Sequence, residues 1–408
     1  MQQEVGENIN YLELISDRLN SFTESQTIAM TVKTRELKAQ GINVINLSLG
    51  ELDFNTPDHV KAAGKKAIDD NYSHYPPVAG YDDLRKAIVQ KFKRENNLDF
   101  SVEQIVVSTG AKHSIMNVIL CLVNANDEVI LPVPYWLSYI EMVKFAGGKP
   151  VLIPSTIDTD FKITPQQIEN AITSRTKIFL FSSPSNPSGS LYNSEELQAF
   201  ARVFARHKHV MIMSDEIYEH INFIGKHQSI GQFKEIRNQL IIVNGVSKGY
   251  AMTGWRIGYI AAPQWLAKAC TKLQSQFTSA ASSISQMAAT GALNGDNSFT
   301  NEIREILHKR RDLMIDLLKD VTGFRTNIPQ GAFYFFADIK YYFGKSDGKT
   351  IINNDKDFCL FLLNDAHVAI VGGSSFGSPD YIRISYATPD YNLIEAVKRI
   401  KASLKKLV

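Results

Sequence analysis

A single lysine, Lys248, lies among small, hydroxyl-bearing and apolar residues, and Arg256 follows it in the segment that begins at Ser247. A lysine amine that is partly removed from water loses its proton more readily and can attack a carbonyl to form an imine. An arginine nearby can bind a phosphate through its planar set of donors. The pair therefore predicts a phosphate-bearing carbonyl cofactor, and pyridoxal phosphate has that chemistry. Taken alone, a Ser-Lys pair also suits a surface lysine beside an ion pair.

Two further segments offer the other groups that such a cofactor needs. Its phosphate needs amides at a helix N-terminus, and the sequence Ser-Thr-Gly-Ala at 108–111 falls at an expected strand-to-helix turn. Its ring nitrogen needs a carboxylate, and Asp215 follows an expected strand. Each signal is weak by itself, because Ser, Thr and Asp are also common helix caps.

Short apolar runs alternate with longer amphipathic stretches along most of the chain, which is typical of strands covered by helices on both faces of a mostly parallel sheet. The candidate polar residues each follow one of these runs, and ligands bind at the carboxyl ends of such strands. The expected strands are residues 105–108, 128–131, 178–181, 210–213 and 240–243, and one expected helix is 112–122.

The pattern changes near residue 300 to a long charged helix, expected at 301–319, and then to short strands, an insertion at 344–357 and a last helix from Tyr391. We predict a large domain at 46–295. Residues 1–45 and 296–408 are expected to form a smaller α/β domain, against which a helix near 28–40 packs.

Composition narrows the possible functions. The 408 residues carry 44 Lys and Arg against 42 Asp and Glu, so a net charge of +2 gives no reason to expect nucleic acid or a membrane surface as partner. The sequence lacks an apolar run long enough to span a bilayer. The polar start and three scattered cysteines predict a cytoplasmic protein with reduced thiols and neither a disulfide framework nor a metal site.

Nine segments, in order, closely resemble class I aminotransferases of pyridoxal-phosphate fold type I, and the resemblance covers nearly the whole chain. They are Ser48–Phe54, His74–Gly80, Ser108–Lys112, Pro134–Trp136, Ser185–Gly189, Ser214–Tyr218, Ser247–Gly258, Gly331–Tyr334 and Arg383–Ala387. The resemblance implies a seven-stranded, mostly parallel sheet in the large domain, and transfer of an amino group from an L-amino acid to a 2-oxo acid by a ping-pong mechanism.

The resemblance also implies a role for each matching residue. Lys248 would hold the cofactor as an imine and move the proton at the substrate α-carbon, while Arg383 would bind the α-carboxylate through a bidentate fork that lysine could not replace. The other implied roles are Asp215 on the ring nitrogen; Tyr218 and Asn186 on the ring hydroxyl; Trp136 stacked on the ring; Ser247, Arg256, Gly110 and Ala111 on the phosphate; Gly50 and Asn186 on the α-carboxylate; and Tyr75 on the phosphate of the neighbouring subunit in a homodimer.

Substrate choice depends on fewer residues. The chain is most similar to the subgroup that includes bacterial aspartate and prephenate aminotransferases, in which a lysine at the position of Lys112 and a threonine at that of Thr27 meet the distal carboxylate. We therefore expect a dicarboxylic substrate, with aspartate and 2-oxoglutarate favoured. The chain departs from the subgroup at Thr23-Glu24, where a basic residue and a proline are usual, and at Leu52 and Gly372, where proline is usual.

Three alternatives remain open at this stage. The chain suits an aminotransferase of aromatic, alanine or broad specificity. A lyase, decarboxylase or cyclase with the same cofactor would share the proton transfer at the α-carbon. A ligand sensor that keeps the fold without turnover is the third, although the chain has no spare length for a DNA-binding domain.

Overall fold

The computed structural model describes residues 11–16, 19 and 26–408, without the side chains of residues 12, 13, 26–29 and 31. Its main feature is a seven-stranded sheet in which only β8 runs antiparallel to its neighbours, which confirms the mostly parallel sheet that the family resemblance implied. In spatial order the strands are β2 (Ile105–Ser108), β8 (Gly258–Ala261), β7 (Leu240–Gly245), β6 (Met211–Asp215), β5 (Thr176–Ser182), β3 (Glu128–Val133) and β4 (Lys149–Pro154).

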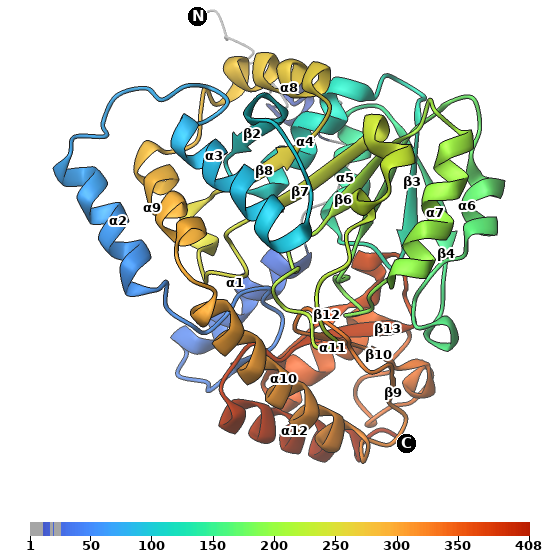
Figure 1. The fold of residues 1–408 in the computed structure, drawn as a ribbon. Coiled ribbons are helices and arrows are strands. Elements are labelled where there is room, and N and C mark those ends of the chain that lie inside the picture. Colours follow the sequence, from blue (N-terminus) through green and yellow to red (C-terminus); the bar gives the residue numbers. More distant parts are fainter. Residues whose placement is uncertain (1–10, 17–18, 20–25) are drawn as a thin grey trace, which may run out of the picture.

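Helices cover both faces of this sheet (Figure 1). Successive strand residues point to opposite faces, so neighbours such as Ile212 and Met213 are buried in different cores. One face packs against α3 (Asp82–Lys91), α6 (Pro165–Ala171), α7 (Ser194–Arg206) and α9 (Ser283–Asn294). The other packs against α4 (Ala111–Leu122), α5 (Ser138–Phe145) and α8 (Gln264–Phe277). Helix α2 (Asp58–Asp69) packs beside α9.

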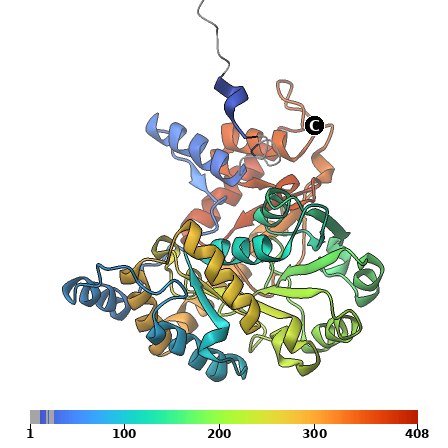
Figure 2. The same cartoon turned by 90° about the horizontal axis from the view of Figure 1, so that it is seen from above.

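Two smaller sheets lie to one side of the large one, with the N-terminal helix and the C-terminal elements around them (Figures 1 and 2). The first has the order β12 (Val371–Gly372), β13 (Tyr381–Ser385), β10 (Tyr334–Asp338) and β9 (Arg325–Thr326). The second pairs β1 (Ile45–Asn46) with β11 (Val368–Ala369). The surrounding helices are α1 (Gln26–Ala39), α10 (Ser298–Leu318), α11 (Asp355–Phe361) and α12 (Asp390–Leu404).

Met30 and Leu37 of α1 pack with Val44, Leu363 and Ala369, so the N-terminal helix does contact the C-terminal part of the chain. Strand β1, from the start of the predicted large domain, pairs with β11. The domain boundaries themselves stay a prediction. No helix among the described residues is long and apolar enough to cross a membrane.

Candidate functional site

A cavity of about 380 Å³ opens where the carboxyl ends of the main strands meet the smaller sheets, and it is of the size that holds a cofactor or small substrate. Its lining brings together residues that are far apart in the sequence: Leu49, Gly50, Glu51, Ala111, Lys112, Trp136, Leu137, Ser138, Tyr139, Ser182, Asn186, Asp215, Ile217, Tyr218, Ser247, Lys248, Thr253, Arg256, Tyr334 and Arg383.

Lys248 follows β7 and directs its amine into this cavity. Its Nζ donates a hydrogen bond to the carbonyl of Gly50 and lies 6.0 Å from the ring centre of Tyr218. Burial lowers the pKa of Lys248 to about 8, and nearby Glu51 opposes the shift. A lysine of this kind is neutral in a useful fraction of molecules near neutral pH, so it can act as a nucleophile or a base.

Asp215, the last residue of β6, is buried on the floor of the cavity. Its Oδ2 accepts a hydrogen bond of 2.6 Å from the hydroxyl of Tyr139, and its Oδ1 accepts one from the amide of Ile217 at 3.2 Å. Burial raises the pKa of Asp215 to about 6, and the bond from Tyr139 opposes the shift. A cationic partner would favour the charged carboxylate further.

The N-terminus of α4 and Arg256 lie together and present groups that could bind an anion. Gly110 caps this helix with φ of 84°, and a Cβ there would lie 2.2 Å from Nη2 of Arg256. Nη1 of Arg256 donates to the carbonyl of Thr253 at 2.9 Å, which orients the guanidinium. Ser247 lines the same side of the cavity. Free amides, a helix dipole and an arginine are the groups that bind phosphate.

Arg383 is a buried cation that forms no ion pair with a carboxylate among the described residues, and it is 2% exposed. Its Nη1 donates to Oδ1 of Asn186 at 2.9 Å and its Nη2 to the carbonyl of Ser48 at 2.6 Å. Its Nε finds no hydrogen-bond partner among the described residues. A buried guanidinium without an anion is costly, so the arrangement suits a carboxylate that arrives with the ligand.

Lys112 lies at the mouth of the cavity, where its side chain keeps contact with solvent. Its Nζ lies 5.1 Å from the ring centre of Trp136. Partial burial and the charge of Arg256 lower the pKa of Lys112. Lys112 is thus a further cation of the cavity, besides Arg383 and Arg256.

The structure brings most of the predicted site residues together. Gly50, Ala111, Lys112, Trp136, Asn186, Asp215, Tyr218, Ser247, Lys248, Arg256 and Arg383 all line the cavity, and Gly110 caps the helix at its edge. Tyr75 is 95% exposed and does not line the cavity of its own chain. Thr27 belongs to α1, but its side chain lies outside the described residues.

Sequence reasoning missed two tyrosines. Tyr139 supports Asp215, and the hydroxyl of Tyr334 lies 2.9 Å from that of Tyr218. The ring of Tyr334 also lies 4.4 Å from Cζ of Arg383. Tyr334 is the last residue of the family-like segment Gly331–Tyr334, and Tyr139 closely follows the segment Pro134–Trp136. Nearness to these motifs was therefore the signal that could have found both tyrosines.

One cavity of this fold thus brings together a lysine, a buried carboxylate, groups suited to a phosphate and an arginine without a carboxylate partner. This combination defines a pyridoxal-phosphate enzyme that acts on amino acids. The family described as aminotransferase class I and II matches residues 42–400, and the chain belongs to it. The protein is therefore a pyridoxal 5'-phosphate-dependent aminotransferase, and its substrates are an amino acid and a 2-oxo acid.

Similar proteins agree over the full length. A probable aspartate/prephenate aminotransferase of Rickettsia conorii is 45% identical over 96% of this chain and 99% of its own. The aspartate/prephenate aminotransferase of Nitrosomonas europaea is 43% identical over the same shares. The crystal structure of the aspartate aminotransferase from Rhizobium meliloti superposes with a TM-score of 0.93 at 42% identity, covering 97% of this chain and 99% of that one.

The residues present fit the cofactor. At Gly258, next to the phosphate-type site, a Cβ would lie 2.1 Å from the amide nitrogen of Ala111, so glycine keeps this helix end close to β8 and leaves its amides accessible. The neutral form of Lys248 suits the cofactor aldehyde, and the buried Asp215 suits a protonated ring nitrogen.

Proposed function

We propose that this aminotransferase acts on dicarboxylic substrates, with aspartate as amino donor and 2-oxoglutarate as acceptor. The observation that carries the proposal is that two separate cations, the buried Arg383 and the solvent-accessible Lys112, line one cavity. An α-amino acid with a second carboxylate can engage both. The names of the relatives from Rickettsia and Nitrosomonas, aspartate/prephenate aminotransferases, support this choice.

Arg383 is proposed to bind the α-carboxylate. Its Nε is free for an acceptor, and the planar guanidinium matches a carboxylate with two parallel hydrogen bonds. Asn186 already accepts a hydrogen bond from Nη1, so it holds the guanidinium in position and can offer its own amide group to the substrate. The amide of Gly50 is proposed to complete this subsite.

Lys112 is proposed to meet the distal carboxylate, with assistance from Thr27. Lys112 lies on the first turn of α4, whose N-terminal dipole also favours an anion. An aspartate aminotransferase from Thermus thermophilus with maleate, a dicarboxylate, has a TM-score of 0.90 to this chain at 37% identity over 95% of it. That likeness supports a subsite with the same charge preference.

Bound pyridoxal phosphate would withdraw electrons from the bonds at the substrate α-carbon. The amine of Lys248, neutral above a pKa of about 8, is proposed to take the proton from this carbon and to return it in the reverse direction. Asp215 is proposed to hold the ring nitrogen protonated, Tyr218 and Asn186 to bind the ring hydroxyl, and Trp136 to cover the ring face. Gly110, Ala111, Ser247 and Arg256 are proposed to hold the phosphate.

A homodimer with shared sites belongs to the proposal. Tyr75 extends from the surface with 95% of its area exposed, so its hydroxyl is available to a second copy of the chain. A tyrosine of one subunit would then bind the phosphate in the other. Sedimentation of the purified protein and of Tyr75→Ala would measure the assembly and its dependence on this contact. The cytoplasmic location stays a prediction.

A panel of amino donors with 2-oxoglutarate tests the specificity. We expect aspartate to give the highest kcat/KM. Lys112→Ala should lower that value by about tenfold or more, because a charge-assisted hydrogen bond is lost. Turnover of alanine and phenylalanine is the internal control and should change little.

The proposal is wrong if aspartate is no better a donor for the wild-type enzyme than alanine or phenylalanine. It is also wrong if Lys112→Ala leaves aspartate turnover intact. One 2-oxo acid should form per donor consumed. Release of ammonia or carbon dioxide instead would show that another reaction of the same cofactor dominates.

A further inference from the structure

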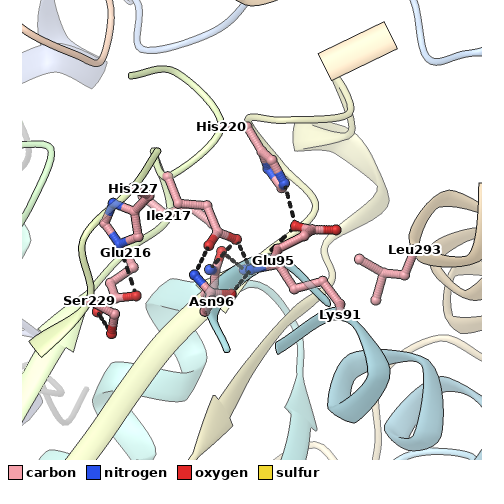
Figure 3. A network of polar contacts seen from close by, with 12 residues as sticks. Lys91, Glu95, Asn96, Glu216, Ile217, His220, His227, Ser229 and Leu293 are labelled. Carbon is pink, nitrogen blue, oxygen red and sulfur yellow. Dashed lines mark hydrogen bonds and ion pairs between the residues drawn. The ribbon is translucent and has the colours of Figure 1, made fainter. Parts of the chain in front are cut away.

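A buried network of charged side chains surrounds Lys91 (Figure 3). It includes Glu216, Glu219 and His220, which belong to the same segment of the chain as Asp215 and Tyr218. Lys91, at the end of α3, is completely buried and its ammonium binds Glu219. Its Nζ also donates to Oδ1 of Asn96 at 2.8 Å and lies 3.7 Å from Glu95. A buried lysine is rare and costly unless paired, so this arrangement needs a reason.

The end of α3 is shaped to assemble this network. The helix continues into a π-helical turn, η3 (Phe92–Asn96), which closes at Asn97 with φ of 54°. This turn places Glu95 and Asn96 beside Lys91, and π-helical turns are frequent at functional sites.

Glu219 connects the network to the strand that precedes Lys248. One carboxylate oxygen accepts a hydrogen bond from Nδ2 of Asn244 at 2.7 Å, and the other accepts one from Asn96 at 3.0 Å. The Oδ1 of Asn244 in turn accepts from the amide of Gly245 at 2.7 Å. The charge of Lys91 keeps the pKa of Glu219 well below its usual range despite burial, so the carboxylate is ionised and accepts all these bonds.

His220 connects the network to the lysine loop itself. Its Nε2 lies 3.0 Å from Oε2 of Glu95, and its ring packs edge-on to Tyr250 at 5.6 Å. A Cβ on Gly249 would lie 2.4 Å from Nδ1 of His220. The imidazole therefore lies directly against the backbone next to Lys248.

Glu216, the neighbour of Asp215, is held in a similar way. Its Oε1 accepts hydrogen bonds from Ser214 at 2.9 Å and from Ser229 at 2.7 Å, and its Oε2 lies 3.1 Å from Nε2 of His227. Along residues 215–220, the side chains of Asp215 and Tyr218 line the cavity, while Glu216, Glu219 and His220 are held in the network.

We propose that Lys91 is a positioning residue for the aminotransferase reaction. Its ammonium neutralises the buried carboxylates and so lets Glu219, Asn244 and His220 hold the two backbone segments that present Tyr218 and Lys248. The proposal rests on the roles proposed above for Tyr218 and Lys248.

Two groups in this cluster, Glu95 with Glu219 and His220, and Glu216 with Glu219 and His227, have spacings that a metal ion could use. The ammonium of Lys91 already binds Glu219, which both groups share.

Lys91→Met keeps an unbranched side chain that is one atom shorter and removes the charge, which leaves Glu219 buried without its cation. We expect the dissociation constant of pyridoxal phosphate to rise by about tenfold or more. We also expect kcat to fall by a larger factor than KM rises, because Tyr218 and Lys248 are displaced while the contacts to the substrate remain. The pH midpoint of the cofactor's visible absorbance should also shift. Glu219→Gln should act in the same direction, and Lys91→Met with Glu219→Gln should be less impaired than the two single changes combined, since the unpaired charge is gone.

Lys93→Met is the matched control, because Lys93 lies two residues on, is exposed and pairs with Asp99 at the surface. It should leave every readout unchanged. If folded Lys91→Met, or Glu219→Gln should Lys91→Met not fold, binds cofactor normally with an unchanged absorbance midpoint and kcat, the proposal is wrong and the network serves stability alone. Restoration of these properties in Lys91→Met by an added divalent cation would agree with the proposal, because the ion would replace the positive charge between the carboxylates. Failure of the proposed role of Lys248 would be recognised separately, because Lys248→Ala would then keep the visible absorbance of the bound cofactor.

Discussion

The hydroxyl of Tyr139 donates a hydrogen bond of 2.6 Å to Oδ2 of Asp215, and both side chains are buried. This bond stabilises the charged carboxylate against the burial that raises its pKa to about 6. Tyr139 comes from α5, which packs against one face of the sheet that contains β6, so the ionisation of Asp215 depends on a contact between two layers of the fold.

Replacement of Tyr139 by phenylalanine should raise the pKa of Asp215, because a donor to the charged form is removed while burial remains. As the pH is lowered, the variant should therefore lose affinity for the cofactor at a pH about one unit higher than the wild type does. This shift is measured by titrating cofactor binding between roughly pH 5 and 8, the range over which Asp215 is expected to change its protonation state. Tyr342→Phe, which removes a buried hydroxyl far from the cavity, should behave as wild type. An unshifted curve for Tyr139→Phe would contradict the assignment.

The pH dependence of cofactor attachment should report Lys248. Burial lowers the pKa of Lys248 to about 8, and only the neutral amine attacks an aldehyde. The rate at which pyridoxal phosphate attaches to the apoprotein should rise as pH increases towards 8 and then level off. A free lysine side chain, whose pKa is about 10.4, serves as control and should keep gaining rate at higher pH. Continued acceleration of the protein reaction up to pH 10, roughly the range of an ordinary lysine, would exclude a lowered pKa.

Arg383→Lys should lower kcat/KM for every amino acid substrate by about a hundredfold, because the ammonium cannot reproduce two parallel hydrogen bonds in the buried site. The visible absorbance of the bound cofactor should be retained, since Arg383 is not proposed to hold it. Steady-state kinetics with the donor panel measures the effect. A loss limited to dicarboxylic donors would instead place the distal carboxylate at Arg383.

Gly258→Ala should weaken the binding of pyridoxal phosphate but hardly that of pyridoxal. The new Cβ would lie 2.1 Å from the amide nitrogen of Ala111, so the N-terminus of α4 must move away from the phosphate. A loss of about tenfold corresponds to one charge-assisted hydrogen bond. Gly254→Ala is the control, because a Cβ there meets no atom within 4 Å. Equal losses for pyridoxal and its phosphate would show a general disturbance and not loss of the phosphate site.

Much of the chemistry could be predicted from short stretches of sequence. Lys248 and Arg256 share one segment, and Asp215 follows an apolar run, so parallel-sheet geometry was enough to expect these residues at one edge. The strands at 105–108 and 240–243 were predicted to within a few residues, since runs of β-branched residues between helices give a strong local signal. Strand β8 was not predicted, and its place between β2 and β7 depends on pairing with strands distant in sequence.

The sequence by itself determined the cofactor, the reaction class and the order of the main elements, because local patterns and family motifs encode them. Only the tertiary structure decided which residues support that chemistry. Tyr139 and Tyr334 became parts of the site because other layers bring them to Asp215 and Tyr218. Lys91 in its own helix is an ordinary charged residue; the packing of η3 against residues 215–220 buries it beside Glu219. The energy of a charge depends on the solvent and partners around it, and those are set by the fold.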